Sequence, residues 1–379
     1  MKIKTLSIAI VLLLISIIGY FFWGKSQPKE NVVKIGAIVF QTGEAAEYGK
    51  WIMNGLEMAK DEINETGGIN GKPVELIYED DNTNPKTAVS AFNKLLATQN
   101  LPIVIAGVTS KSAMALAPNA ESKKIVLFSP CSSTPDYTNA GDYIFRNWSS
   151  DNLEGKLMAE YAYNTLGYRN IATLTMNSDY SLGLKKVFIK RFSELGGRIS
   201  YSEEFAEGTT DFKTIIAKLS TQKIDAIYLP SHAKEVGAFL KQMKQNNKYF
   251  KILGCVTYES QELINIAGKS TDGIIFTTPA FNTEIKDTLT QSFITKYEKR
   301  FGSKPENFAA HSYDALKIIA LAIQKGGYTS DGIKNALYQI SNYLGVSGLT
   351  SFDKNGDVLQ PAMIKQIKNQ QFIPLTTTK

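Results

Sequence analysis

The chain has 379 residues, a length that exceeds one typical hydrophobic core and indicates two domains or lobes. An apolar fraction of 43% with 21% charged residues is typical of a globular protein. The formal charge of +6 comes mostly from scattered Lys residues, whereas nucleic-acid readers gather Arg and Lys on one face beside stacking aromatics. The composition therefore predicts no nucleic-acid partner.

The N-terminal stretch TLSIAIVLLLISIIGYFFWG, residues 5–24, contains no charged residue. A signal-peptide core has about 7–15 apolar residues, whereas about 20 can span a bilayer as a helix. We therefore expect an uncleaved transmembrane signal anchor at 5–24, between a cytoplasmic tip at 1–4 and a polar linker at 25–31. A long cleaved signal peptide is the alternative. Either way the body is exported, to the periplasm or the outer face of the membrane.

From residue 32 onward, short apolar runs alternate with helical patterns. The strand VVKIGAIVF leads to a helix in which Ile52, Leu56, Ala59 and Ile63 share one face. The stretch NTNPKTAVSAFNKLLA (82–97) predicts a helix with Asn84 as its N-cap and Pro85 at its first position. A short helix is expected from Ser110, and further helices near 152–166, 181–195, 211–221, 234–245, 260–267, 284–301, 307–325 and 330–340. Strands that alternate with helices predict an α/β fold with parallel sheets covered on both faces. Two such series predict two doubly wound lobes.

Polar loops follow the expected strands at five places. They are GVTSKS (107–112), SPCSSTP (129–135), NSDYSLG (177–183), PSHAKE (230–235) and GCVTYES (254–260). Ligands of doubly wound sheets bind beyond the carboxyl ends of the strands. These loops therefore predict a ligand site, although a Pro-bounded turn is the plain alternative for 129–135.

Catalytic and metal-binding motifs are absent from the sequence. It has no GxxxxGK[ST], GxGxxG after a strand, HExxH or GxSxG pattern, so we expect no enzyme and no cofactor. With two Cys and two His, a metal site is not expected. Cys131 and Cys255 are expected to be free thiols. His232 lies at a strand end, in a ligand site or at the surface, and His311 is expected to be structural.

Several stretches in order resemble one family. GAIVFQTGEAAEYGKWIMNGLEMAKDEINETGGINGKPVELIYEDDNTNPKTAV resembles the start of the leucine/isoleucine/valine-binding protein family, the type I periplasmic binding proteins that serve ABC importers. YSLG, DFKTIIAKL and GLTSFDKNGD extend the similarity over residues 32–370. The resemblance implies two lobes joined by a three-crossover hinge. Lobe one would comprise 32–147 plus 278–345, and lobe two 148–277 plus 346–379.

The same resemblance assigns the ligand carboxylate to one lobe. The matching hydroxyl positions are Ser110 and Ser133, with Cys131 and Ser132 beside them. Ser110 also opens a helix, whose unpaired N–H groups and dipole favour an anion. We therefore interpret the loop 129–135 as half of a carboxylate-binding site.

Aromatic and acidic positions of the family are only partly retained. Tyr48 and Tyr180 match the aromatic residues that enclose the ligand from either lobe. The family acid that pairs with the ligand ammonium matches Val256, so that ion pair is missing. Glu259, Asp179 or Asp151 could replace it, although each is expected to be a solvated loop charge.

These observations predict a solute-binding protein that captures a small carboxylate-bearing ligand by hinge closure and delivers it to an ABC permease. A branched-chain amino acid is the leading ligand. The alternatives are a ligand-sensing clamp for signalling, or transport of an amine-free acid or amide. A buried ammonium without a counter-charge is costly, so the missing acid keeps the second alternative open.

Overall fold

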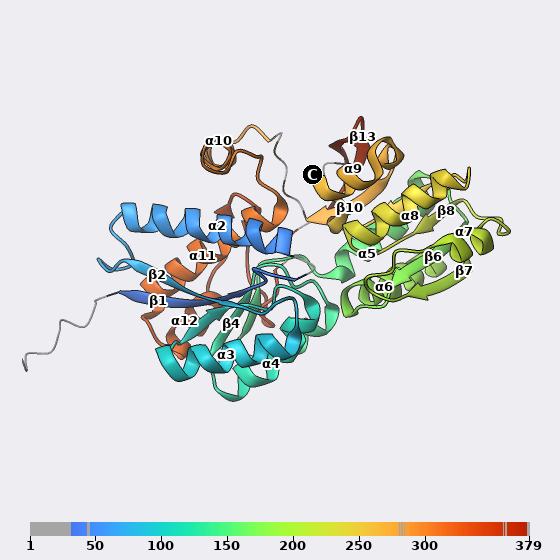
Figure 1. Cartoon of the computed structure of the whole chain (residues 1–379). Coiled ribbons are helices and arrows are strands. Elements are labelled where there is room, and N and C mark those ends of the chain that lie inside the picture. The colour runs from blue at the N-terminus through green and yellow to red at the C-terminus, as the bar shows by residue number, and fades with distance from the viewer. Residues whose placement is uncertain are drawn as a thin grey trace, which may run out of the picture.

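Two lobes lie side by side, each built around one β-sheet (Figure 1). The computed structural model describes residues 32–43, 46–279, 281, 283, 285–358, 360 and 362–376. The expected signal anchor at 5–24, its tip at 1–4 and the linker at 25–31 lie outside these ranges. None of the helices within them is both long and apolar enough to cross a bilayer.

The first lobe contains a five-stranded sheet in which every strand pair is parallel. In spatial order its strands are β2 (Val74–Asp80), β1 (Val33–Val39), β3 (Ile103–Ile105), β4 (Val126–Ser129) and β5 (Ile144–Arg146). Six helices and a hairpin complete the lobe: α2 (Ala46–Glu65), α3 (Pro85–Gln99), α4 (Ser110–Ser122), α10 (Thr288–Phe301), α11 (Asn307–Gly326), α12 (Ser330–Tyr338), β11 (Tyr343–Gly345) and β12 (Gly348–Thr350).

Helices cover both faces of this sheet. Ile35, Ala37 and Val39 of β1 share a core with α2, α10, α11 and α12. Ile38, on the opposite face of the same strand, shares a second core with α3 and α4. Successive side chains of a strand point to opposite faces, so a strand buried on both sides must be apolar throughout. This explains why β1 has no polar side chain from Ile35 to Val39.

The second lobe contains a seven-stranded sheet. In spatial order its strands are β14 (Gln371–Thr376), β13 (Ala362–Lys368), β10 (Ile275–Pro279), β9 (Ile252–Gly254), β8 (Ala226–Tyr228), β6 (Asn170–Met176) and β7 (Arg198–Phe205). The strands from β10 to β7 are parallel, but β13 and β14 run antiparallel to their neighbours. The expectation of wholly parallel sheets is therefore wrong at this edge, because a tight turn at 369–370 joins the last two strands.

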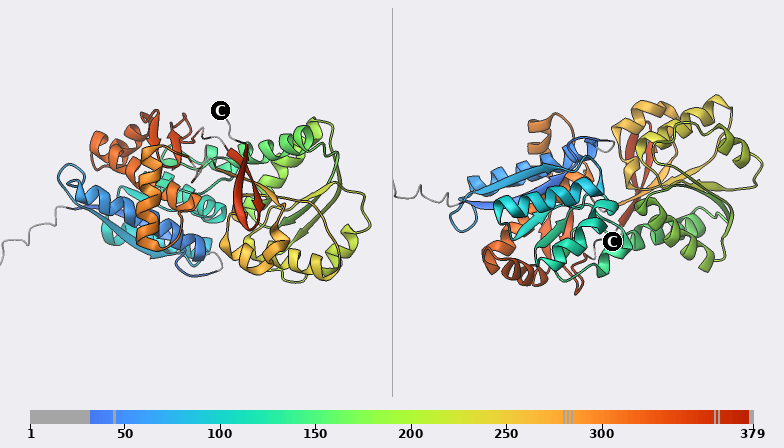
Figure 2. Two further views of the ribbon diagram at one scale, coloured as in Figure 1. Left: turned by 90° about the horizontal axis from the view of Figure 1, so that it is seen from above. Right: turned by 60° about the horizontal axis from the view of Figure 1, so that its bottom comes forward.

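Five helices cover the second sheet, with α5 and α6 on one face and α8 and α9 on the other (Figure 2). Their bounds are α5 (Asp151–Glu160), α6 (Asp179–Glu194), α7 (Lys213–Leu219), α8 (Ala233–Gln245) and α9 (Gln261–Ala267). A π-helical turn at Tyr161–Thr165 continues α5, so the helical segment expected at 152–166 is present, with a widened last turn.

Helix starts follow the capping residues. Asn84 caps α3, accepting the Lys86 and Thr87 N–H groups at 2.9 and 3.3 Å, as expected. The start expected at 284 for α10 is wrong. Asp287 is the N-cap and accepts the Thr290 N–H at 2.9 Å. Ile285 lies within the expected range but precedes the helix and is exposed.

Three connections pass between the lobes, and one turn of α11 bonds to all of them. The first connection joins β5 to α5, and Asn147 in it donates to the His311 carbonyl at 2.7 Å. The second leaves β10, where Thr278 Oγ1 accepts Asn307 Nδ2 at 2.8 Å. The third joins β12 to β13, and Gln360 Oε1 lies 3.1 Å from His311 Nε2.

Candidate ligand-binding site

A cavity of about 70 Å³ lies between the two lobes. It is lined by Phe40, Tyr48, Val108, Thr109, Ser110, Cys131, Ser133, Trp148, Tyr180, His232, Val256, Thr257 and Phe308. All five polar loops expected at strand ends contribute to this lining. The cavity can hold several water molecules and hence a small ligand.

The N-terminus of α4 forms one wall. Thr109 is its N-cap, accepting the Ser112 N–H at 3.1 Å, and Ser110 is the first helical residue. Both line the cavity. The 13-residue helix therefore directs its positive dipole end at the cavity, which favours an anionic group there.

The loop at 129–135 forms the adjacent wall, but part of its backbone is already engaged. Ser129 Oγ donates to the Gly107 carbonyl at 2.8 Å and accepts the Cys131 and Ser132 N–H groups at 3.4 and 2.9 Å. These two N–H groups are therefore bonded within the loop. The groups at the cavity are the side chains of Cys131 and Ser133.

A buried ion pair holds this loop in place. Arg146 Nε lies 2.7 Å from Asp357 Oδ1, and Arg146 Nη2 donates to Asp357 Oδ2 at 2.8 Å. Arg146 Nη1 also donates to the carbonyls of Ser132 and Thr134, at 3.3 and 2.8 Å. The Arg146 side chain is 0% exposed, and its bonds to the carbonyls on either side of Ser133 hold that segment in place.

Aromatic rings form the apolar wall. The Tyr48 and Phe308 ring centroids lie 5.0 Å apart, and Phe308 stacks on Trp148 at 5.0 Å. Burial raises the pKa of the Tyr48 hydroxyl, which is therefore neutral at physiological pH. Rings offer broad contact to an apolar ligand side chain.

The second lobe supplies the opposite wall. Tyr180 lies in the first turn of α6, and His232 is the N-cap residue of α8. Val256 and Thr257 begin a 3-10 turn after β9. The apolar residue at Val256, where the family acid was expected to be missing, thus lies at the cavity. No lining residue in the described part of the chain is acidic.

Two of the nine predicted site residues do not line the cavity. Ser132 is fully buried and is not part of the cavity lining. Glu259 instead accepts Lys365 Nζ at 2.5 Å, Thr278 Oγ1 at 3.1 Å and Asn307 Nδ2 at 3.0 Å. Its carboxylate is thus engaged beside β10, so the structure gives no support to Glu259 as a partner for a ligand ammonium.

Two buried acids behind the cavity were missed by sequence reasoning. Asp151 and Glu154 are both 0% exposed, whereas Asp151 was expected to be a solvated loop charge. Burial raises the pKa of Asp151 to about 7 and that of Glu154 well above its usual range. The available signal was their spacing, since i and i+3 share one face of a helix.

The lobes touch on both sides of the cavity. Lys111 Nζ of the first lobe pairs with Glu207 Oε2 of the second at 2.8 Å. Ser260 Oγ donates to Glu47 Oε2 at 3.3 Å, across the other side. The two lobes are therefore in contact around the cavity.

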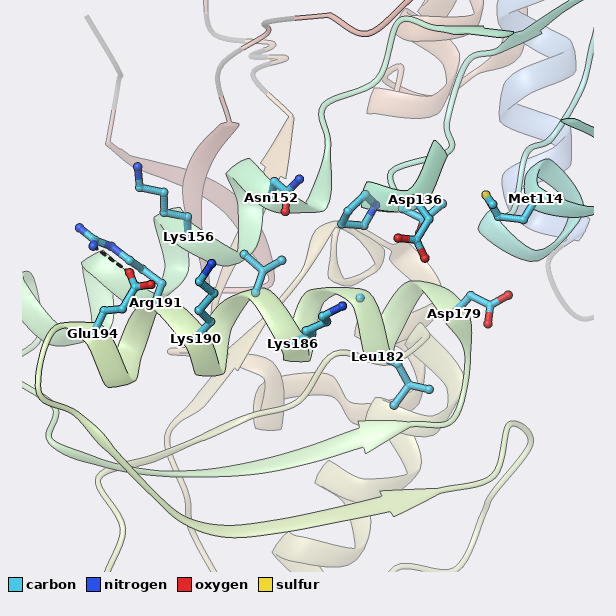
Figure 3. Close-up of a pocket in the computed structure, with 14 residues that line it drawn as sticks. Met114, Asp136, Asn152, Lys156, Asp179, Leu182, Lys186, Lys190, Arg191 and Glu194 are labelled. Atoms are coloured by element: carbon cyan, nitrogen blue, oxygen red, sulfur yellow. Dashed lines mark hydrogen bonds and ion pairs between the residues drawn. The ribbon is translucent and has the colours of Figure 1, made fainter. Parts of the chain in front are cut away.

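A larger groove of about 720 Å³ runs outside the cavity, between α6 and the first lobe (Figure 3). Asp179, one of the acids considered for the ligand ammonium, lines this groove and not the cavity. Lys186 and Lys190 project from α6, and Arg191 pairs with Glu194 (Figure 3). The groove contains none of the nine predicted site residues. In the described residues no cluster of His, Cys, Asp and Glu could hold a metal ion.

The fold and the cavity define a two-lobed solute-binding protein with its site between the lobes. The family model described as periplasmic binding protein matches residues 32–371. The chain therefore belongs to the periplasmic binding proteins, type I, of the leucine/isoleucine/valine-binding family. This family is extracytoplasmic, binds solutes without enzymatic turnover, and implies an ABC transporter as partner.

Similar proteins match over most of the chain. The Leu/Ile/Val-binding protein homolog 1 of Brucella abortus is 28% identical over 348 residues, covering 90% of this chain and 91% of the relative. The substrate-binding protein LivJ of Streptococcus pneumoniae, solved with isoleucine, is 28% identical with a TM-score of 0.85, covering 91% of this chain and 100% of that one.

A more distant structure shares the fold. The solute-binding protein of Rhodopseudomonas palustris BisB5, solved with 3,4-dihydroxybenzoic acid, has a TM-score of 0.83 at 22% identity. It covers 92% of this chain and 98% of that chain.

Proposed function

We propose that this protein captures a branched-chain amino acid in the cavity between its lobes and delivers it to an ABC importer. The carrying observation is the convergence of Ser110, Ser133 and the N-terminus of α4 on a cavity that is otherwise largely apolar. A carboxylate requires hydrogen-bond donors, and an aliphatic side chain requires an apolar wall. This cavity offers both.

The carboxylate is placed at α4 in this proposal. The hydroxyls of Ser110 and Ser133 can both donate to it, and charge-assisted hydrogen bonds are stronger than neutral ones. The helix dipole adds to the attraction. The arrangement resembles other anion sites at helix N-termini.

The aliphatic side chain then meets Tyr48, Phe308 and Trp148. These rings are close enough to form a continuous surface. The similar protein LivJ was solved with isoleucine, a ligand that has both a carboxylate and a branched side chain. This likeness supports the same ligand class here.

Closure of the two lobes around the ligand is the proposed mechanism. A ligand that bonds to both walls stabilises the closed arrangement by its differential affinity for that state. Lys111–Glu207 and Glu47–Ser260 join the lobes on either side of the cavity and would form as the lobes approach.

An amine-free acid is the second candidate, favoured by one observation. Val256 replaces the expected acid, and no acidic residue in the described part of the chain lines the cavity. The Rhodopseudomonas palustris protein, which shares this fold, was solved with 3,4-dihydroxybenzoic acid, a ligand that has no amine.

The two candidates are separated by calorimetric titration. Leucine, isoleucine, valine and their 2-oxo analogues would each be titrated into the purified protein. We expect micromolar binding of an amino acid, which corresponds to about 8 kcal/mol, and weaker binding of its 2-oxo analogue. Tighter binding of the oxo acid would favour the second candidate, and binding of neither group would refute the proposed ligand class.

Tethering by residues 5–24 is also part of the proposal. The uncharged run of this segment is long enough to cross a bilayer. We expect the protein to stay in the membrane fraction with residue 1 retained. Intact-mass measurement of soluble protein that starts between residues 24 and 32 would show that the segment is a cleaved signal peptide instead.

A further inference from the structure

Asp151 and Glu154 form a buried acidic pair on the first turns of α5. Both side chains are completely buried, and neither makes an ion pair with a cation among the described residues. Arg146 is the nearby cation, but its guanidinium is engaged by Asp357. The pair therefore lacks a counter-charge within the described protein.

The pair lies directly behind the cavity wall. The Asp151 N–H donates to the Ser133 carbonyl at 2.8 Å, and the nearby Ser133 hydroxyl partly offsets the rise in the Asp151 pKa. On the side of α6, a Cβ at Gly183 would lie 3.4 Å from Asp151 Oδ2. Since Ser133 and Tyr180 line the cavity, Asp151 lies immediately beside two residues of the cavity wall.

The charged and titratable neighbours do not neutralise the pair. Arg146 faces Asp151 from the end of β5, and Tyr180 and Tyr228 face the pair from α6 and β8. Cys255 faces Glu154 from the loop after β9. Apart from the engaged Arg146, these groups are neutral or become negative on ionisation, so they oppose ionisation of the acids.

Unpartnered hydroxyl groups extend the polar region along the sheet. The side-chain oxygens of Thr175, Tyr228 and Ser231 are buried and have no hydrogen-bond partner within the described residues. Thr277 lies beside Glu154. Buried polar groups are normally paired, so this region has room for hydrogen bonds to a polar group of a ligand.

We infer that Asp151 is the counter-charge for an ammonium group of the ligand, with Glu154 remaining protonated behind it. This inference rests on the proposed function and specifies its ligand as a zwitterion. The carboxylate lies at α4 and Ser110, and the ammonium is directed past Ser133 and Tyr180 toward Asp151. The acid missing at Val256 is thereby replaced from a different element, α5.

The geometry also explains why one acid of the pair suffices. Two adjacent carboxylates repel each other when both are ionised, and a single ammonium neutralises only one. Asp151 is the acid next to the cavity residue Ser133, whereas Glu154 lies one turn further along α5, beside Thr277. Asp151 is therefore assigned the charge and Glu154 the proton.

Calorimetric titration of leucine and 4-methyl-2-oxopentanoate tests this assignment in the whole exported protein. Asp151→Asn should weaken leucine binding about tenfold to hundredfold, as expected for the loss of a charged hydrogen-bond partner. Binding of the oxo acid should stay the same or tighten. Glu154→Gln, which mimics the protonated acid, should change leucine binding less than about threefold.

Asp179→Asn is the matched control. Asp179 is an exposed acid one residue before Tyr180 and lines the outer groove, so its loss should leave both affinities unchanged. Equal leucine affinity in wild type and Asp151→Asn would overturn the inference while leaving the proposed function intact. Failure of the wild type to bind either compound would refute both.

Proton release by the wild type provides a test that needs no variant. The pKa of Asp151 is raised to about 7 by burial, and a neighbouring ammonium would lower it. Leucine binding near pH 7 should therefore release protons, detected as a binding enthalpy that depends on the ionisation enthalpy of the buffer. The oxo acid should release none. Leucine binding without proton release would overturn the inference even if Asp151→Asn fails to fold.

Discussion

Replacing Arg146 by Met is expected to destabilise the protein and to disturb the ligand site together. Arg146 is fully buried and makes two short contacts with Asp357. Its removal leaves that carboxylate without its cation, although the Thr138 hydroxyl still donates to Asp357 Oδ2 at 2.7 Å. Losing one member of a buried ion pair costs about 3–5 kcal/mol. The carbonyls of Ser132 and Thr134 lose their donor at the same time, so the Ser133 segment loosens.

Urea unfolding and calorimetry measure the two effects. We expect Arg146→Met to lower the free energy of unfolding by about 3–5 kcal/mol and to weaken ligand binding. Lys218→Met is the control, because the exposed Lys218–Glu203 pair contributes about 1 kcal/mol or less. The double variant with Asp357→Asn should recover part of the loss, since the unpaired charge is then removed.

The reasoning has a clear point of failure. If Arg146→Met loses no more stability than Lys218→Met, the buried ion pair does not brace the loop. If stability falls but the affinity for an identified ligand does not, the position of Ser133 is independent of Arg146. Either result would refute the structural link between the ion pair and the cavity.

Three further predictions concern the site. Ser110→Ala and Ser133→Ala should each weaken ligand binding by about 1–3 kcal/mol with little change in stability. Calorimetry that finds both affinities unchanged would show that the loop 129–135 is an ordinary turn and does not bind the ligand. The folded pKa of Asp151 is raised to about 7, so the unliganded folded state keeps a proton that the unfolded chain loses between about pH 4 and about pH 7. Wild-type stability should therefore fall by up to about 1.4 kcal/mol per pH unit across this window relative to Asp151→Asn, and urea unfolding curves that shift in parallel would contradict the burial of the charge. Lys111→Met should weaken binding by less than about 1 kcal/mol, because its pairing with Glu207 is partly exposed, and the effect should vanish at high salt; a loss that persists in salt would point to packing instead of charge.

The location of the cavity follows from local sequence signals. Each of the five polar loops comes directly after an apolar run, and the carboxyl ends of parallel strands meet at one edge. Residues such as Ser110, Tyr180 and His232 could therefore be expected near one another although they lie far apart in the chain. The cavity lining contains all three.

The charge balance behind the cavity could not be predicted in this way. Asp151 follows the N-cap residue Ser150, a position where acids are usually solvated and favoured by the helix dipole. Its burial results from the packing of α5 against α6, which involves Gly183 of a separate element. Glu259 shows the converse, since its bond to Lys365 joins residues 106 positions apart.

The edge strands of the second sheet also could not be predicted from local sequence patterns. The antiparallel β13 and β14 form only because the chain returns to the second lobe after its last passage. The short apolar run in β14 is exposed on one side, and such a pattern does not distinguish a sheet edge from a surface loop.

The bonds that one turn of α11 makes with all three connections bear on how the molecule can move. Asn307 and His311 are four residues apart and belong to the first lobe, yet between them they bond to Asn147, Thr278 and Gln360. These bonds hold all three connections against the same turn of α11, so we expect the second lobe to move about this turn when the lobes open or close. A residue inserted between Asn307 and His311 would rotate the two residues by about 100° relative to each other, so the bond to Thr278 and the bonds to Asn147 and Gln360 could not all be kept. The same insertion near the C-terminal end of α11 would leave Asn307 and His311 in register with each other.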